Sequence, residues 1–146
     1  VVAVESPFFA QVEAQLELFL TTGQTEMMDT ANWTTHQWLH FLRTMPEAIS
    51  MERLTALDKS FGFTKTGNSE IAAEWFVLAI ENDYRTADAA IEGFLIRVGR
   101  RKFLTPIYGA LVTADPTMER ARSIYEKARP NYHSVSTNTL DEMLDI

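Results

Sequence analysis

The stretch "NSEIAAEWFVLAI", residues 68–80, decides the fold class, because its apolar residues recur at helical spacing rather than alternating as in a strand. The residues "KTGNSE" (65–70) read as the loop and cap that open this helix. So broad an apolar face should be covered by neighbouring helices on most sides. The face comprises Ile71, Ala72, Trp75, Phe76, Leu78, Ala79 and Ile80.

Helical signals continue toward the N-terminus. A first helix is expected from about Pro7 to Leu20, with Ser6 as its cap and Gly23 after its end. Thr34 and Gln37 have the spacing of a capping box and predict a second helix that runs to about Met45. A third helix should follow Ser50 and end at "FGF" (61–63).

The C-terminal half shows the same rhythm. We expect a helix over about 85–98 with Gly99 as its C′ residue, and another from near Lys102 through Leu111, with Pro106 in its first turn or so. Asp115 and Pro116 predict the cap and first residue of the next helix, and the tail predicts one short acidic helix. The chain therefore reads as a single all-α domain, residues 1–146, of seven or eight short helices. From about residue 35 the helix pairs follow one another like the layers of an α-solenoid.

Composition excludes several classes of protein. The formal charge of −7 argues against nucleic acid or an anionic membrane as partner, and no apolar run reaches the length of a membrane span. No basic segment precedes "VVAV" (1–4), so an intact signal peptide is not expected. The absence of cysteine excludes disulfides and thiolate chemistry but leaves the compartment open; a cytoplasmic location is our expectation.

The segment "HQWLH", residues 36–40, resembles the H-E-x-x-H motif of zinc proteases. Gln37 stands where the catalytic glutamate belongs, and glutamine cannot act as a general base at neutral pH. The position of the third ligand in gluzincin proteases is occupied here by Lys59, which would repel a metal ion. We therefore interpret His36 and His40 as residues on a solvated helix face, and we predict no catalytic or metal-binding residue in this chain.

A cluster of cations interrupts this acidic chain. Residues 93–114 hold Arg97, Arg100, Arg101 and Lys102 and no acid, whereas residues 1–42 hold five acids and no Lys or Arg. Such a run can be an ordinary solvated surface, and Arg97 can offset the negative end of its helix. However, Arg100 and Lys102 flank a helix start, where a guanidinium fork, an ammonium group and nearby amides suit a carboxylate.

At this point the sequence resembles a known family. "GRRKFLTPIYGAL" (99–111) is similar to the Gly-[Arg/Lys]-x-Lys-[Phe/Tyr]-x-x-Pro segment in the C-terminal helical domain of the leukotriene hydrolase and aminopeptidase B group of zinc aminopeptidases. Three further segments agree in order, and the resemblance spans about residues 33–137. They are "TTHQWLHFL" (34–42), "GNSEIAAEWFVLAI" (67–80) and "ARSIYEKARPNYHSVS" (121–136).

The resemblance implies a fold, a cofactor and a site. The expected fold is a right-handed α–α superhelix of the armadillo or HEAT type, forming the C-terminal piece of a longer aminopeptidase. Zinc and its H-E-x-x-H helix would belong to the parent's catalytic domain, which becomes the principal partner of this chain. Arg100 and Lys102 would bind the C-terminal carboxylate of short peptide substrates at one side of the substrate channel. Arg101 falls at a variable family position and should face elsewhere.

A second reading comes from a different class of protein. A free-standing α-solenoid that binds a protein partner would show the same helix rhythm, and its acidic surface could dock a basic segment. The length of the open reading frame distinguishes the two readings, because only the aminopeptidase has a zinc domain upstream.

Overall fold

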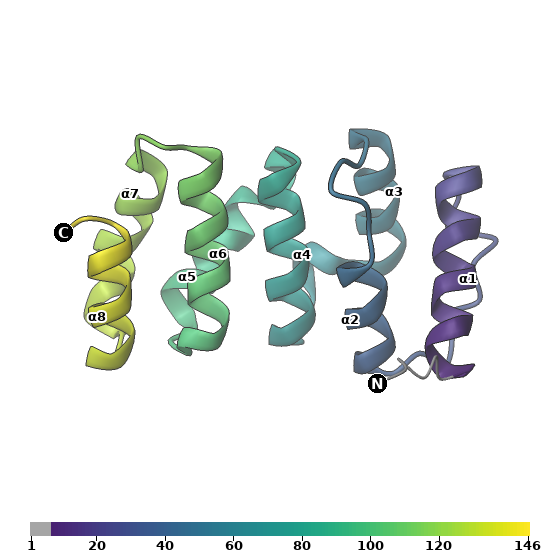
Figure 1. The fold of residues 1–146 in the computed structure, drawn as a ribbon, viewed down its shortest axis with the longest axis horizontal. Coiled ribbons are helices and arrows are strands. Elements are labelled where there is room, and N and C mark those ends of the chain that lie inside the picture. Colours follow the sequence, from purple (N-terminus) through teal and green to yellow (C-terminus); the bar gives the residue numbers. More distant parts are fainter. Residues whose placement is uncertain (1–6) are drawn as a thin grey trace, which may run out of the picture. The chain divides into compact units, whose positions relative to one another are not determined.

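A computed structural model describes residues 7–146 of the chain, with side chains from residue 9 onward. Within this part there are eight α-helices, three short 3-10 helices and no strand, so the predicted all-α class is confirmed (Figure 1). Ser6, the predicted cap of the first helix, lies outside the described residues. The helices are α1 (Pro7–Thr22), α2 (Thr35–Arg43), α3 (Met51–Phe61), α4 (Ser69–Glu81), α5 (Asp88–Arg97), α6 (Arg101–Ala114), α7 (Glu119–Ala128) and α8 (Ser134–Met143).

The helices form two compact units, Val1–Trp75 and Phe76–Ile146, and the boundary between them falls within α4. The assignment of the whole chain to a single domain stays a prediction. Each unit has its own set of buried apolar side chains.

In the first unit, α2 begins with the predicted capping box. The backbone N–H of Thr34 donates to Gln37 Oε1 at 2.8 Å, and the backbone N–H of Gln37 donates to Thr34 Oγ1 at 3.4 Å. Gln37 is buried, so its side chain is committed to this helix start. The N-cap of α3 is Ser50, as predicted, and Gly62 ends that helix in the left-handed conformation at φ 64°.

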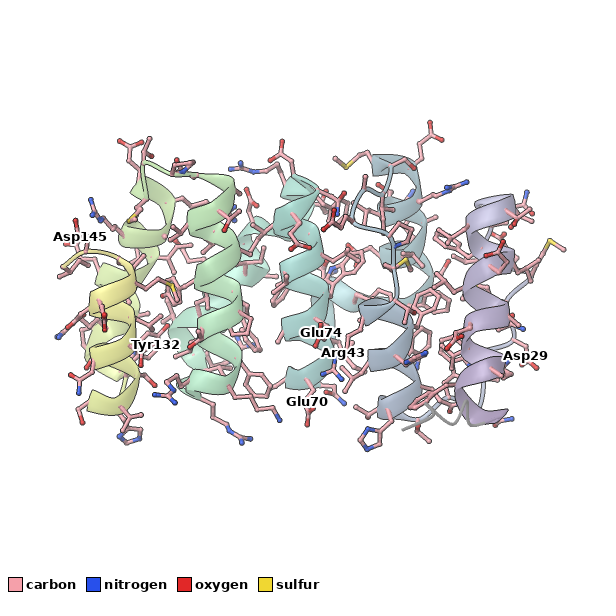
Figure 2. All side chains as sticks on the ribbon, in the orientation of Figure 1. Asp29, Arg43, Glu70, Glu74, Tyr132 and Asp145 are labelled. Atoms are coloured by element: carbon pink, nitrogen blue, oxygen red, sulfur yellow. The ribbon has the colours of Figure 1, made fainter. Side chains whose placement is uncertain are left out.

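The first residues of α4 are fixed against the rest of the first unit. Asn68 caps the helix, since its Oδ1 accepts from the backbone N–H groups of Glu70 and Ile71. Trp75 is fully buried, and its indole N–H donates to Thr64 Oγ1 at 3.0 Å. On the surface, Figure 2 shows Arg43 of α2 and Glu74 of α4 pointing toward one another, with Arg43 Nε 2.7 Å from Glu74 Oε1.

In the second unit, alternate helices pack side by side. The pairs α5 with α7 and α6 with α8 make the main helix contacts, and Figure 1 shows α5 behind α6 and α7 behind α8. This is the two-layer arrangement expected of α-solenoid repeats. Its core includes Leu104 and Tyr108 of α6 and Tyr125 of α7, all at most 1% exposed.

Two local predictions in this unit are wrong. The helix expected from Pro116 begins instead at Glu119, because the Asp115 carboxylate accepts from the backbone N–H and hydroxyl of Thr117 and holds a turn there. The residue before α7, Met118, consequently takes a left-handed conformation at φ 62°. Pro106 lies in the second turn of α6 rather than the first, where it cannot donate the usual helical hydrogen bond.

Candidate functional site

The turn between α5 and α6, residues 98–100, places the predicted carboxylate-binding residues. Gly99 occupies the predicted C′ position but does not adopt the left-handed conformation that glycine usually provides there. Val98, the C-cap, is extended, with φ −100° and ψ 126°. The carbonyls at the end of α5 must therefore find other donors.

Side chains from the segment between α7 and α8, and from α8 itself, supply those donors. The hydroxyl of Tyr132 donates to the carbonyl of Leu95, and Asn131 Nδ2 donates to the carbonyl of Ile96 at 3.4 Å. Ser136 Oγ donates to the carbonyl of Gly99 at 3.2 Å. Three side chains therefore hold the turn that precedes α6, which fixes where the first residues of α6 project.

Arg100 and Lys102 meet at one aromatic ring. The guanidinium carbon of Arg100 lies 5.5 Å from the centroid of the Phe103 ring, and the ammonium nitrogen of Lys102 lies 5.4 Å from it. Both distances fall within the range of a cation–π contact. The structure thus brings the two predicted residues together around Phe103, and the side chains of both are exposed.

Two further features concern the charges around Arg100. Arg100 is the N-cap of α6, and no side chain caps that helix start, so the positive end of the helix dipole lies beside the two cations. Among residues 9–146, no carboxylate lies within ion-pair distance of Arg100. A cation at a helix N-terminus opposes the dipole, which is the opposite of what helix stability favours.

Arg101 points away from this pair. Its guanidinium Nη1 donates to Thr139 Oγ1 of α8 at 3.3 Å. This position agrees with the expectation that Arg101 faces elsewhere, and it makes Arg101 a matched control for Arg100.

The two histidines of "HQWLH" differ in environment. His36 is exposed, whereas His40 packs against α1: its Nε2 lies 2.8 Å from Glu13 Oε2, and its ring stacks on Phe9 at 4.3 Å. The interpretation of both histidines as residues on a solvated face is therefore wrong for His40, because α1 covers it. Within residues 9–146, no three His, Asp or Glu side chains come together as metal ligands. No helix among residues 7–146 has the length and apolarity to cross a bilayer.

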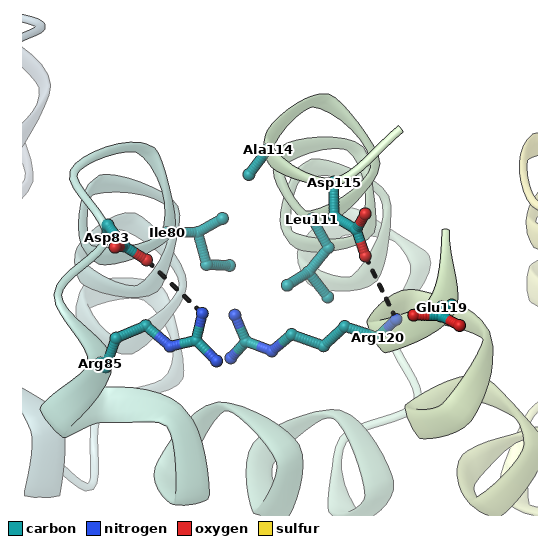
Figure 3. Close-up of a pocket in the computed structure, with 8 residues that line it drawn as sticks. All are labelled: Ile80, Asp83, Arg85, Leu111, Ala114, Asp115, Glu119 and Arg120. Carbon is teal, nitrogen blue, oxygen red and sulfur yellow. Dashed lines mark hydrogen bonds and ion pairs between the residues drawn. The ribbon is translucent and has the colours of Figure 1, made fainter. Parts of the chain in front are cut away.

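A cavity of about 450 Å³ at the α4–α5 and α6–α7 turns is a second place where cationic side chains converge. Figure 3 shows the guanidinium groups of Arg85 and Arg120 pointing toward one another across it. The acids Asp83, Asp115 and Glu119 line the same cavity.

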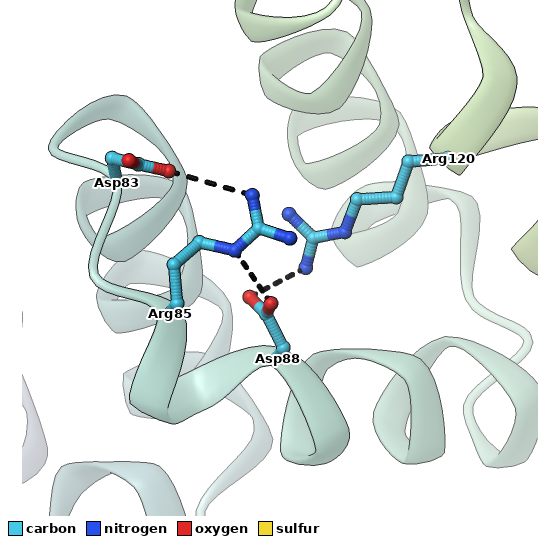
Figure 4. A network of polar contacts seen from close by, with 4 residues as sticks. All are labelled: Asp83, Arg85, Asp88 and Arg120. Carbon is cyan, nitrogen blue, oxygen red and sulfur yellow. Dashed lines mark hydrogen bonds and ion pairs between the residues drawn. The ribbon is translucent and has the colours of Figure 1, made fainter.

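These arginines are already neutralised. Asp88 lies between them, with its carboxylate 2.6 Å from Arg85 Nε and 2.9 Å from Arg120 Nη2 (Figure 4). Asp83 adds a longer contact to Arg85 at 3.5 Å, and the hydrogen bond to Asp88 raises the pKa of Arg85. We interpret this network as a connection between α5 and α7, since an incoming carboxylate would have to compete with Asp88.

Sequence reasoning missed the residues that support the site. Tyr132, Asn131 and Ser136 lie more than 30 residues from the carbonyls they bind, so no local pattern reports them. Phe103 could have been singled out, because it belongs to the family-like segment 99–111. Its position in that segment alone did not indicate a role.

The chain is similar to known proteins over most of its length. Residues 33–144 match the protein family described as "Leukotriene A4 hydrolase, C-terminal". A Neurospora crassa protein named Leucine aminopeptidase 2 is 30% identical over 121 residues, which cover 81% of this chain and 18% of that protein. Proteins of the same name from Yarrowia lipolytica and Pyricularia oryzae are 26% and 28% identical, over 80% and 73% of this chain. The chain spans less than a fifth of the length of each of these relatives.

Proposed function

This chain belongs to the leukotriene A4 hydrolase C-terminal family, and from that membership we propose that it is the C-terminal helical domain of a zinc metallo-aminopeptidase. In this proposal the domain closes one side of the substrate channel, and Arg100 and Lys102 bind the C-terminal carboxylate of short peptides. Its partners are the parent's catalytic domain and the peptide substrates.

One observation carries the proposal: two cations share the Phe103 ring beside the uncapped start of α6. The guanidinium fork of Arg100 can bind both oxygens of a carboxylate, and Lys102 adds a point charge. The exposure of Arg100 and the absence of a described carboxylate partner leave its donors available to a ligand. The Arg85–Arg120 pair lacks this property, because Asp88 already binds both guanidinium groups.

Binding the C-terminal carboxylate of a peptide would contribute to catalysis by positioning its N-terminal bond. The zinc ion that we propose for the parent's catalytic domain supplies water activation for cleavage of the N-terminal peptide bond. Arg100 and Lys102 would fix the register of a short peptide, so that its N-terminal bond lies where that chemistry occurs. A tripeptide should benefit most, since its carboxylate lies at a set distance from that bond.

Arg100→Ala in the full-length enzyme tests this role. We compare a tripeptide that has a free C-terminal carboxylate with the same tripeptide carrying a C-terminal amide. For the free acid, KM should rise and kcat should fall, and kcat/KM should drop about 10- to 100-fold, the range for losing a hydrogen bond to a charged group. The amide should change little.

Arg101→Ala is the matched control, because it removes the same charge at the next residue. The side chain of Arg101 faces Thr139 and not the proposed site. It should leave the ratio of acid to amide hydrolysis unchanged. Tripeptide kinetics that are unaltered in Arg100→Ala would remove the carboxylate-binding role.

The alternative is a free-standing α-solenoid that binds a protein partner. The relatives favour the first reading, since the matching part makes up less than a fifth of proteins named as aminopeptidases. Sequencing the gene upstream of Val1 decides between them, because a start codon immediately before Val1 supports the alternative.

A further inference from the structure

We propose that Phe103 is a positioning residue that holds Arg100 and Lys102 in one arrangement and thereby sets the preference for peptides with a free C-terminal carboxylate. This inference rests on the proposed function. It assigns to the aromatic ring a role in substrate selection in addition to its place in the core.

The ring is itself fixed in place. Phe103 is 5% exposed and packs edge-on against Phe94 of α5, with ring centroids 6.2 Å apart at 66°. Phe94 is 2% exposed and contacts Phe76 in the same way, at 5.5 Å and 70°. The Phe103 ring therefore cannot move without disturbing the core of the second unit.

Two long cationic side chains lie against this fixed ring. Arginine and lysine side chains lose up to about 2 kcal/mol of rotamer entropy when they are ordered, so a cation ordered only by its ligand binds that ligand more weakly. An aromatic face attracts a cation and restricts it before the ligand arrives. Because one ring contacts both cations, at 5.5 and 5.4 Å, it also relates their positions to each other.

A role in the core alone does not account for this geometry. A purely apolar core residue at this position could equally be leucine, which fills space but has no π-face to attract a cation. The placement of both charged groups near the ring is the feature that leucine would lose. The two roles therefore predict different results for variants that keep an apolar core.

The experiment uses the full-length enzyme with Phe103→Leu and Phe103→Tyr, assayed on the free-acid and amide forms of one tripeptide. We expect Phe103→Leu to lower kcat/KM for the free acid about five- to tenfold, the loss from two weakened cation–π contacts, and to leave the amide within about twofold. Phe103→Tyr keeps the π-face and should keep the ratio of acid to amide hydrolysis near that of the wild type.

Phe41→Leu is the control for stability, because it removes a fully buried ring of the first unit that packs against Trp33 and Trp38 and does not support Phe103. It should lower the melting temperature about as much as Phe103→Leu without changing the acid-to-amide ratio. An equal fall of that ratio in Phe41→Leu, or an equal loss on acid and amide in Phe103→Leu, overturns the inference in favour of a structural role.

If Phe103→Leu does not fold, a fluorinated phenylalanine at position 103 provides the test instead. Fluorine weakens the negative face of the ring at nearly constant shape, so the acid-to-amide ratio should fall as fluorine is added while the melting temperature stays constant. A constant ratio overturns the inference. Arg100→Ala separates the two proposals: if it leaves the ratio unchanged the proposed function fails, and if it alone lowers the ratio only the role of Phe103 fails.

Discussion

Removing the hydroxyl of Tyr132 should destabilise the second unit more than removing the hydroxyl of Tyr108, although the two groups are hydrogen-bonded to each other. The Tyr132 hydroxyl has one hydrogen, which it donates to the carbonyl of Leu95. In the 3.1 Å contact between the two hydroxyls, Tyr108 must therefore be the donor. The three residues form a chain of hydrogen bonds that ends on α5.

The magnitudes follow from what each substitution leaves unpaired. Tyr108→Phe removes the outer donor, and Tyr132 keeps its bond to Leu95, so the expected cost is about 1 kcal/mol. Tyr132→Phe strands the Tyr108 hydroxyl and the Leu95 carbonyl, in residues that are both fully buried. Each stranded group costs about 1–3 kcal/mol, which gives about 2–6 kcal/mol in total.

The variant that carries both Tyr108→Phe and Tyr132→Phe tests the coupling between the two hydroxyls directly. Once Tyr132 is phenylalanine, changing Tyr108 to phenylalanine removes a stranded hydroxyl, so the second substitution should cost nothing or restore stability by about 1 kcal/mol. Burial raises the pKa of Tyr108 and of Tyr132, so both hydroxyls stay protonated through neutral pH and titration does not obscure the comparison.

Urea denaturation of the 146-residue chain at pH 7 measures all three variants, with far-UV circular dichroism as the signal. Equal costs for the two single variants that add in the double variant would refute the hydrogen-bond chain. In the full-length enzyme, Tyr132→Phe should also reduce hydrolysis of free-acid tripeptides, because its bond to Leu95 helps to hold the turn before Arg100.

Three further outcomes concern stability of the same chain. Arg129 binds both carboxylate oxygens of Asp141 and lowers the pKa of Asp141 to about 2. The stabilisation by this ion pair is therefore complete above about pH 4 and is lost as the pH falls toward 2. In an acid titration, the free energy of unfolding of Asp141→Asn should fall less steeply with pH than that of the wild type. Thr34→Ala should cost about 1 kcal/mol in urea denaturation and Thr34→Ser much less, since serine still caps α2. Gly62→Ala should cost about 1–2 kcal/mol because Gly62 has a φ of 64°, whereas Gly67→Ala, at a position without positive φ and with open space, should be nearly neutral.

Much of the fold could be predicted because its signals are local. The capping box at Thr34 and Gln37, the cap at Ser50 and the stop at Gly62 each depend on residues within one helical turn, and all three are present in the structure. The prediction at Asp115 failed because of an interaction that is equally local in the sequence. The Asp115 carboxylate accepts hydrogen bonds from the backbone N–H and hydroxyl of Thr117, and the helix begins three residues after Pro116.

The candidate site was only partly predictable, because its support is distant in sequence. Arg100 and Lys102 could be selected from their spacing and from the resemblance, and the structure places both beside Phe103. The conformation of the turn could not be predicted, since Gly99 suggested a left-handed helix end. Tyr132 and Ser136 cap that region from more than 30 residues away, which removes the need for that conformation.

The Arg100–Lys102 pair and the Arg85–Arg120 pair show when the charges of neighbouring residues in the sequence predict an unpaired arginine. Arg85 lies between Asp83 and Asp88 in the sequence, and both contact it in the structure, so its neutralisation follows from local spacing. Arg120 also binds Asp88, but from 32 residues away, which the sequence does not report. Arg100 combines a segment free of acids, residues 93–114, with a turn held by uncharged hydroxyl and amide side chains. Because those capping groups carry no negative charge, they fix the turn without neutralising Arg100, whereas a carboxylate cap would compete with the ligand carboxylate that we propose.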